Sequence, residues 1–585
     1  MKELKKLNHL FKRYRWQLLS GLLVTVIARL LSIVLPKYVG HIINLLNEYE
    51  SRSAKDPDAF REDLLWSIII ILGSTLLAAA LTFVMRQLII VVSRHLEYDL
   101  KNLIYQQYQR LSLGFYKQNR TGDLMNRISE DVSKVRMYMG PAIMYGMNMI
   151  TLFVVVITVM IQTAPKLTLY TIAPLPFLSV AIYLVSREIH KRSLRVQELL
   201  SNLNTVSQES FSGISVIKAY NLTPQINAQF VDISNESKEK NIDLARIQAL
   251  FFPLMLFLIG LSNVMVIYIG GKQVMDGIIP LGTIPEFLLY VNMLTWPVAT
   301  LGWVTNMVQQ AEASQKRINE FLDIVPEIQN PTQEPETTTG AVSFKNVDFV
   351  YADTNIHALK NLSFNVPAGS TLAILGRTGS GKSTILELIG RLYDTQTGAV
   401  LIDGKDIKEH NLDALRQAIG YVPQDAFLFS DTIANNIAFG KHDATQEEIE
   451  TAARNAVVHK NISKFTKGYE TVLGERGISL SGGQKQRISI ARAIIKRPQI
   501  LLFDDCLSAV DTETEEKILN NLKGITQNTT TIIVSHRVSS AKNADHIIVL
   551  DNGAIIEQGT HEKLLQGNGY YAELFANQML EETSA

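Results

Sequence analysis

The sequence predicts a multidomain chain, in which an all-α transmembrane domain with six spans precedes an α/β domain. Three observations predict this order. The 585 residues exceed what one hydrophobic core holds. Long apolar runs fill the chain before about residue 310 and then stop, and short β-rich runs afterwards alternate with helical ones. We expect a transmembrane domain at residues 1–323, a linker at 324–342 and an α/β domain at 343–580.

The transmembrane domain is predicted from six apolar segments that are long enough to cross a bilayer as helices. The third and fourth segments are separated only by the sequence TAPK, which predicts a tight hairpin. The six segments are roughly 16–36, 64–85, 142–163, 166–186, 248–270 and 283–305.

Loop charges predict the orientation of these spans. Six Lys and Arg residues precede the first span, whereas the loop after it, NEYESRSAKDPDAFRED, is mainly acidic. The positive-inside rule therefore places both termini and the α/β domain in the cytoplasm. The basic N-terminal segment enters the first span without a small-residue cleavage site, so we expect it to be retained.

The two longest connections, about residues 86–140 and 187–247, then lie on the cytoplasmic side. Both are polar helical sequences with few breakers, so the membrane helices are expected to extend well past the bilayer into the cytoplasm. Their tips, at residues 115–131 and 212–221, suit short helices that dock on another domain. The same pattern also fits loop tips that contact only solvent, which is the competing interpretation.

Two ionisable residues, Arg29 and Glu286, fall inside predicted spans, where a charge is costly and usually faces a cavity or a partner. They are candidate residues of a transport pathway. Met and aromatic residues of the last two spans could line an adaptable apolar cavity, although ordinary helix packing accounts for most of them.

Composition excludes several kinds of site. Lys plus Arg and Asp plus Glu each number 56, so a net charge of zero gives no electrostatic support for a nucleic-acid partner. The single cysteine, Cys506, excludes an intramolecular disulfide and a cysteine-based zinc cluster.

The α/β domain contains an apolar strand, a glycine-rich turn and a helix start in TLAILGRTGSGKST, residues 371–384. The turn matches G-x-x-x-x-G-K-[ST], the phosphate loop of P-loop NTPases. Its backbone N–H groups surround phosphates, Lys382 reaches the β- and γ-phosphates, and the Ser383 hydroxyl binds Mg²⁺. The predicted nucleotide-binding residues are Gly376, Arg377, Thr378, Gly379, Ser380, Gly381, Lys382, Ser383 and Thr384.

A second motif is LLFDDCLSAVD, residues 501–511. Residues 500–503 are expected to form a buried parallel strand whose carboxyl end delivers Asp504 to the Mg²⁺. A surface Asp pair is the competing interpretation, and the complete phosphate loop disfavours it. These two motifs fit kinases, helicases and translocases equally well.

The stretch LSGGQKQRISIARA, residues 480–493, separates these alternatives. Ser481 and the glycines after it open a helix, whose unpaired N–H groups and positive end make a second anion site. One nucleotide does not need two such helix starts in one chain. Here the chain resembles the ATP-binding cassette (ABC) family, whose signature is the LSGGQ of Leu480, Ser481, Gly482, Gly483 and Gln484.

Six spans followed by one cassette resemble a half-size type IV ABC exporter of the bacterial multidrug group, over essentially the whole chain. The resemblance implies an integral protein of the bacterial inner membrane that uses ATP and Mg²⁺. It also implies a dimer, in which each ATP lies between the phosphate loop of one chain and the signature of the other.

The resemblance also assigns roles to five residues other than the phosphate loop, Asp504 and the signature. Tyr351 would stack on adenine, and Gln424 would sense Mg²⁺ and contact the cytoplasmic loops of the transmembrane domain. Glu475 would touch the loop at residues 212–221, and Asp511 would communicate across the dimer. His536 would contact the γ-phosphate beside Asp505, the position of the catalytic carboxylate.

Asp505 departs from the family pattern, because members that hydrolyse ATP efficiently usually carry Glu there. Asp is one methylene shorter, which withdraws the carboxylate by roughly 1.5 Å, and a misplacement of about 1 Å can cost on the order of 100-fold in rate. We expect a slow site and, as in heterodimeric bacterial exporters, a second half-transporter chain as partner. A homodimer in which a backbone shift restores the reach of Asp505 is the alternative.

The resemblance implies export of hydrophobic or amphipathic small molecules by alternating access, with membrane lipid and no nucleic acid as further partners. A homodimeric lipid or lipopolysaccharide flippase shares every motif quoted above. A peptide exporter is disfavoured because no peptidase domain precedes the first span. Six spans disfavour a soluble ABC ATPase, and an importer would normally carry its spans on a separate chain.

Overall fold

The computed structural model describes residues 2–48, 57–474, 480–508, 510–525 and 528–584. The chain divides into two compact units. The membrane unit comprises residues 1–107 and 122–324, and the cassette unit comprises residues 108–121 and 325–585.

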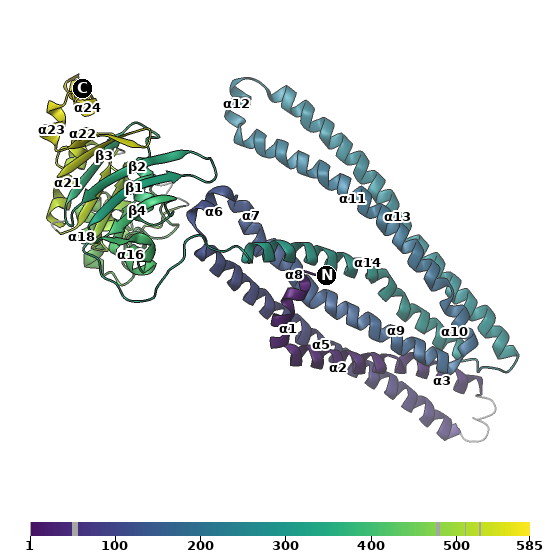
Figure 1. Ribbon diagram of the computed structural model, residues 1–585. Helices are drawn as coiled ribbons and strands as arrows, with labels where there is room; N and C mark the ends of the chain where they lie inside the picture. Colours follow the sequence, from purple (N-terminus) through teal and green to yellow (C-terminus); the bar gives the residue numbers. More distant parts are fainter. Residues whose placement is uncertain (1, 49–56, 475–479, 509, 526–527, 585) are drawn as a thin grey trace. The chain divides into compact units, whose positions relative to one another are not determined.

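The membrane unit is helical throughout its described residues, apart from short connections (Figure 1). A 3₁₀ turn at Leu4–Leu7 precedes the first helix, and π-helical turns at Arg127–Asp131 and Tyr138–Ala142 flank α8. The helices are α1 (Asn8–Arg13), α2 (Arg15–Ser32), α3 (Val34–Asn47), α5 (Pro57–Arg110), α7 (Thr121–Asn126), α8 (Val132–Met137), α9 (Ile143–Thr163), α10 (Pro165–Ile172), α11 (Pro174–Ser212), α12 (Ile214–Ala219), α13 (Thr223–Met275) and α14 (Thr283–Leu322).

Helices cover each of the six predicted spans. The tight hairpin is confirmed, because α9 ends at Thr163 and α10 begins at Pro165. The fourth span is not one continuous helix, since Pro174 starts α11 directly after α10 ends. Among the described residues, four helical stretches are long and apolar enough to cross a membrane by composition, namely Arg15–Asn47, Pro57–Arg110, Thr121–Thr163 and Thr223–Met275.

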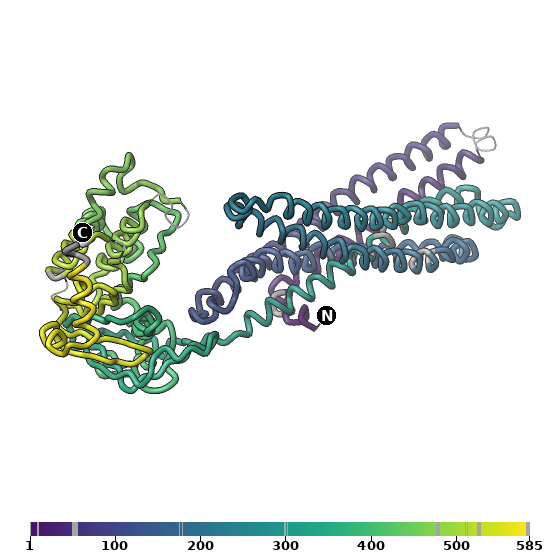
Figure 2. The backbone as a smooth tube through the Cα atoms, turned by 90° about the horizontal axis from the view of Figure 1, so that it is seen from above, coloured from purple at the N-terminus to yellow at the C-terminus, as the bar shows by residue number. Residues whose placement is uncertain are grey.

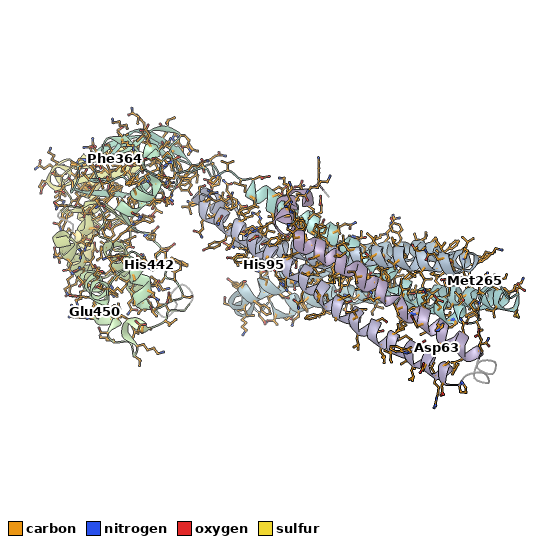
Figure 3. The ribbon with its side chains drawn as sticks, turned by 90° about the horizontal axis from the view of Figure 1, so that it is seen from below. Asp63, His95, Met265, Phe364, His442 and Glu450 are labelled. Atoms are coloured by element: carbon orange, nitrogen blue, oxygen red, sulfur yellow. The ribbon has the colours of Figure 1, made fainter. Side chains whose placement is uncertain are left out.

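Several helices are much longer than a bilayer is thick. The helices α5 and α13 contain 54 and 53 residues, which at about 1.5 Å per residue is roughly 80 Å, against about 30 Å for a hydrocarbon core. Asp63 lies near the beginning of α5 and His95 lies farther along the same helix (Figure 3). The long helices α11 and α13 run side by side (Figure 1 and Figure 2), and Arg195 and Glu236 form an ion pair between them at 2.7 Å.

Glu286 lies next to a close crossing of α3 and α14. A Cβ atom on Gly282 would lie 1.9 Å from the carbonyl oxygen of Gly40, so the approach requires glycine. One turn later, Glu286 is 7% exposed and accepts a hydrogen bond from the Tyr290 hydroxyl at 2.8 Å. Arg29 is half-buried. A pathway role for Glu286 and Arg29 stays a prediction.

The cassette unit contains two sheets (Figure 1). The smaller, antiparallel sheet has the order β2-β1-β4-β5, and the larger sheet has the order β10-β9-β3-β8-β7-β6, with only β10 antiparallel to its neighbour. The strands are β1 (Val342–Val350), β2 (His357–Val366), β3 (Thr371–Gly376), β4 (Thr397–Ile402), β5 (Lys405–Asp406), β6 (Ile419–Val422), β7 (Ile500–Asp504), β8 (Thr530–Val534), β9 (His546–Asp551) and β10 (Ala554–Gly559).

Short helices complete the cassette unit. In Figure 3, Phe364 of the smaller sheet lies apart from His442 and Glu450, which belong to the helical part. The helices are α6 (Leu113–Gln118), α15 (Lys382–Ile389), α16 (Leu412–Ala418), α17 (Ile433–Ala438), α18 (Gln446–Asn455), α19 (His459–Ile462), α20 (Gly482–Ile494), α21 (Thr512–Ile525), α22 (Val538–Ala541), α23 (His561–Gln566) and α24 (Tyr570–Ser584), with 3₁₀ turns at Ile407–Glu409 and Gly468–Glu470.

The central strands explain where a site can form. β7 and β8 are buried at every position, and β3 is buried at all but its first, as expected for parallel strands covered on both faces. Because these strands are parallel neighbours, their carboxyl ends lie at one edge of the sheet. The prediction of a helical transmembrane domain followed by an α/β domain is confirmed.

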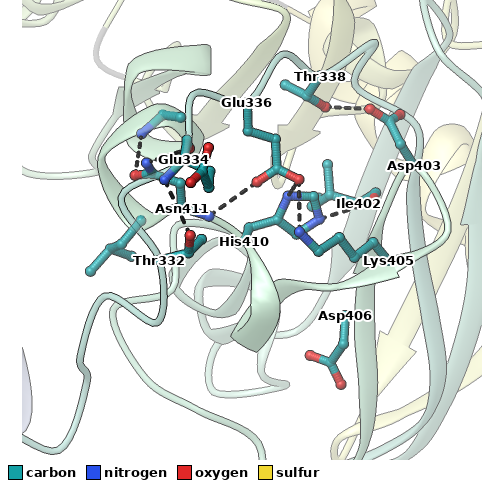
Figure 4. A network of polar contacts seen from close by, with 12 residues as sticks. Thr332, Glu334, Glu336, Thr338, Ile402, Asp403, Lys405, Asp406, His410 and Asn411 are labelled. Carbon is teal, nitrogen blue, oxygen red and sulfur yellow. Dashed lines mark hydrogen bonds and ion pairs between the residues drawn. The ribbon is translucent and has the colours of Figure 1, made fainter.

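The segment predicted as a linker has no helix or strand before Val342, where β1 begins, but hydrogen bonds hold it against the cassette (Figure 4). The Glu336 carboxylate accepts from Lys405 Nζ at 2.9 Å and lies 3.0 Å from Nδ1 of His410. Farther along, Asp403 accepts from the Thr338 hydroxyl at 2.5 Å. We call residues 330–341 the strap.

Candidate functional site

The phosphate loop connects β3 to α15. Gly381 adopts φ +96°, and a Cβ atom there would lie 2.4 Å from the carbonyl oxygen of Ala358, so glycine is required. Lys382 Nζ donates to the carbonyl oxygens of Gly376 and Arg377, each at 2.8 Å. Burial lowers the pKa of Lys382, and the charges of two nearby Asp residues oppose that shift. The loop therefore holds a cation that can turn toward phosphate.

Ser383 and Asp504 meet where a Mg²⁺ ion is expected. The Ser383 hydroxyl donates to Oδ1 of Asp504 at 2.8 Å. Burial raises the pKa of Asp504, and the hydrogen bond from Ser383 opposes the shift. Within the described residues no three His, Cys, Asp or Glu side chains form a metal cluster. A Mg²⁺ ion bound with ATP does not need such a cluster, because it typically binds through one or two protein oxygens together with phosphates and waters.

Asp505 lies beside both of the residues predicted to act with it. Its Oδ2 accepts from Gln424 Nε2 at 3.4 Å and lies 3.7 Å from Nε2 of His536. Its Oδ1 is buried and has no hydrogen-bond partner among the described residues. The backbone of Asp505 is left-handed, with φ +44°, a conformation that Asp tolerates better than most residues. Because Gln424 uses its amide nitrogen here, its amide oxygen is the group available to a cation.

The signature residues cap a helix, as the sequence predicts. Ser481 Oγ accepts from the Gln484 N–H at 3.4 Å, and Gln484 Oε1 accepts from the Ser481 N–H at 3.1 Å, which together form a capping box for α20. A Cβ atom on Gly482 would meet no atom within 4 Å, so the helix start is open to a ligand. Leu480 is buried beneath it.

Asp511, which is predicted to communicate across the dimer, lies directly before α21. Asp511 caps α21, because its Oδ1 accepts from the Thr514 N–H at 2.9 Å, and this hydrogen bond lowers the pKa of Asp511. The predicted roles of Gly483 and Asp511 across a dimer stay predictions. Glu475 lies outside the described residues.

Tyr351 is anchored to the helix that follows the phosphate loop. Its hydroxyl shares a hydrogen bond of 2.9 Å with Thr384 Oγ1 and donates to Glu387 Oε2 at 2.8 Å. Burial raises the pKa of Tyr351. The Nζ atom of Lys117, on α6, lies 4.9 Å from the centre of the Tyr351 ring and 5.1 Å from that of Tyr393. The ring predicted to stack on adenine therefore contacts a short segment near the predicted cytoplasmic tip of α5.

Sequence patterns missed three residues that touch this site, Lys117, Gln486 and Gln578. Gln486 Nε2 donates to the carbonyl oxygen of Gln424, and it lies in the signature helix already quoted. Gln578 Nε2 donates to the carbonyl oxygen of His536 at 2.8 Å. No local pattern marks Gln578 or Lys117, since both act on residues far away in sequence.

Two protein-family matches cover most of the chain. Residues 18–298 match the family described as ABC transporter transmembrane region. Residues 359–508 match the family described as ABC transporter. The matched ranges contain the phosphate loop, the signature, Asp505 and all of the predicted spans except the start of the first and the end of the sixth.

Individual proteins are similar over nearly the whole chain. The uncharacterized ABC transporter ATP-binding protein YknU of Bacillus subtilis (strain 168) is 37% identical, over 98% of this chain and 97% of the relative. The multidrug resistance-like ATP-binding protein MdlA of Escherichia coli (strain K12) is 36% identical, over 99% and 97%. An ATP-dependent lipid A-core flippase of Syntrophus aciditrophicus (strain SB) is 34% identical, over 90% and 87%. A solved bacterial Atm1-family ABC exporter with ATP bound superposes with a TM-score of 0.79 at 28% identity, over 96% of this chain and 98% of that one.

Proposed function

Because the chain belongs to the ABC transporter family, we propose that it is one half of an ATP-driven exporter of hydrophobic or amphipathic small molecules. One observation carries the proposal. A single chain joins a helical membrane unit to a cassette unit in which the Ser383–Asp504 pair and the Asp505–His536 pair occur together. The multidrug resistance-like relative supports the substrate class.

The proposed cycle uses two chains that close head to tail. The open start of α20 in one chain then faces the phosphate loop of its partner, where Lys382 and the loop N–H groups bind the phosphates. Ser383, Asp504 and the amide oxygen of Gln424 would hold Mg²⁺, which would supply positive charge beside the phosphates of ATP. The helical extensions pass the closure of the cassettes to the spans, so that the substrate cavity opens outward, and hydrolysis and product release reset it.

We place both termini and the cassette on the cytoplasmic side, because Lys and Arg residues gather before the first span. The helical extensions then lie in the cytoplasm, with α6 and α12 at their tips. The exposed apolar side chains of α12, which include Ile214 and Val216, suit docking on the cassette of a second chain.

We further propose that Asp505 makes a slow site and that the partner is a different chain with Glu at this position. The shorter side chain supports this, because the loss of one methylene withdraws the carboxylate by roughly 1.5 Å. Its Oδ2 faces Gln424 and His536. An intact signature lets this chain complete the site of such a partner. A homodimer with two Asp505 sites is the competing assembly.

A lipid flippase is the second candidate, and the 34% identical lipid A-core flippase is the observation that favours it. Both candidates move amphipathic molecules, so they differ in substrate size and not in the ATP site.

A transport assay in proteoliposomes tests the proposal. The chain carrying Asp505→Glu, which removes the proposed slow site, would be reconstituted with a cationic amphipathic dye in one set of vesicles and a fluorescent lipid A analogue in another. ATP-dependent movement of dye, lost in Lys382→Ala, is the expected result. Movement of the lipid alone would favour the flippase. ATP hydrolysis without movement of either probe would contradict both.

A further inference from the structure

The last helix, α24, binds the loop that carries His536. Gln578 Nε2 donates to the carbonyl oxygen of His536 at 2.8 Å, and Gln578 Oε1 accepts from the N–H of Val538 at 2.8 Å. One side-chain amide therefore bridges the backbone on both sides of Arg537. A primary amide presents one acceptor and one donor side by side, which matches this pair of backbone groups.

The loop is also fixed from its other side. It consists of residues 535–537, between the end of β8 and the start of α22. The Arg537 side chain donates to the carbonyl oxygens of Ser508 and Val510, which follow Asp505, at 3.3 and 3.2 Å. The loop is thus clamped between the segment after Asp505 and α24.

The start of α24 is anchored independently of Gln578. The Glu557 carboxylate accepts from the N–H groups of Tyr570 and Tyr571 at 2.5 and 3.2 Å. Tyr571 is fully buried and belongs to the same apolar cluster as Val538 and Ala541. The helix therefore has a fixed position from which the half-buried Gln578 reaches the loop.

We propose that Gln578 is a positioning residue for His536, so that α24 sets the distance between the imidazole and the carboxylate of Asp505. This inference rests on the proposed function and on the contact of His536 with the γ-phosphate that the family resemblance implies. The His536 side chain is 40% exposed, so we expect its backbone to determine where the ring stands. A displacement of about 1 Å at such a group can cost on the order of 100-fold in rate.

The test is a double-mutant cycle in lipid nanodiscs. Gln578→Ala, His536→Ala and the double variant would be assayed for ATPase activity in the wild-type chain and in the Asp505→Glu background, so that a slow site does not hide the effect. We expect Gln578→Ala to lower kcat about 10-fold or more, with the KM for ATP changed less than about twofold. In the double variant, Gln578→Ala should add nothing to His536→Ala, because it acts through that residue.

Two further variants separate positioning from folding. Gln578→Glu keeps the acceptor for Val538 but loses the donor for His536, so it should behave like Gln578→Ala. Asn577→Ala removes an exposed side chain of the same helix and should match the wild type. Hydrogen exchange at residues 535–539 should rise in Gln578→Ala and not in Asn577→Ala.

Several results would overturn the inference. Multiplicative losses in the double variant, or an unchanged kcat in Gln578→Ala, would show that Gln578 does not act through His536. A failure of the proposed function looks different. In that case His536→Ala itself would leave kcat unchanged in a chain that turns over, whatever Gln578→Ala does.

Discussion

The ring nitrogen Nε2 of His536 lies 3.7 Å from Oδ2 of Asp505, the same oxygen that accepts a hydrogen bond from Gln424. Oδ2 of Asp505 thus faces both Gln424 and His536, while Oδ1 is buried without a hydrogen-bond partner among the described residues. In the proposed mechanism, this carboxylate and His536 together orient the water molecule that attacks the γ-phosphate. The length of the side chain at position 505 therefore decides how well the water is placed.

Asp505→Glu is expected to raise the ATPase rate of the purified chain by about 10- to 100-fold, because the longer side chain restores the missing reach. Asp505→Asn should stay at the level of Lys382→Ala, since an amide does not accept a proton from water. Steady-state phosphate release in lipid nanodiscs measures both. Robust turnover in the wild type, with no gain from Asp505→Glu, would favour the homodimer.

The ATP-site motifs could be predicted from sequence because each depends on a short local pattern. The strand before the phosphate loop, the glycines that take left-handed backbone and the capping box of Ser481 are all encoded within a few residues. Asp504 could be placed because a buried strand ends there. These patterns constrain the backbone locally, so tertiary context changes them little.

The contacts between distant segments could not be predicted. Gln578 binds the backbone of His536, 42 residues earlier, and nothing around Gln578 differs from an ordinary amphipathic helix. The Pro- and Thr-rich strap has the composition of a loose linker, yet its polar side chains bind Lys405 and Asp403. Composition indicates that a segment lacks helix and strand, but it does not indicate whether hydrogen bonds hold that segment in place.

Ser383→Ala is expected to raise the Mg²⁺ concentration for half-maximal ATPase activity about 10-fold, because a hard oxygen ligand next to Asp504 is lost. Ser383→Thr keeps the hydroxyl and should behave like the parent, since the motif accepts either residue. Titrating Mg²⁺ at constant free ATP in the Asp505→Glu background measures the shift. An equal Mg²⁺ requirement in the parent, Ser383→Ala and Ser383→Thr would show that Ser383 does not bind the metal.

Tyr351→Ala is expected to raise the KM for ATP about 10-fold or more, because stacking of a base on an aromatic ring contributes roughly 1–3 kcal/mol. Tyr351→Phe keeps the ring and loses only the hydroxyl that binds Thr384 and Glu387. Its KM should stay within about threefold of the parent. Nucleotide titrations in the Asp505→Glu background distinguish the two variants. If Tyr351→Ala and Tyr351→Phe raise the KM for ATP equally, the hydroxyl and not the ring of Tyr351 supports ATP binding.

Glu336→Gln is expected to lower the melting temperature of the chain at pH 7 by a few degrees, since each kcal/mol corresponds to about 2–4 °C for a unit of this size. Partial burial raises the pKa of Glu336, but hydrogen bonds from Lys405 and the Asn411 N–H outweigh it and leave the pKa below 4.5. The ionised carboxylate therefore stabilises the fold above about pH 4.5, and this contribution is lost as the pH falls through the lowered pKa. Thermal unfolding would be measured in detergent between pH 7 and pH 4. The difference in melting temperature between Glu336→Gln and the wild type should shrink only near pH 4. Thr337→Ala changes an exposed residue of the same strap and should have the melting temperature of the wild type at every pH. If Glu336→Gln lowers the melting temperature equally at every pH, packing and not charge holds the strap.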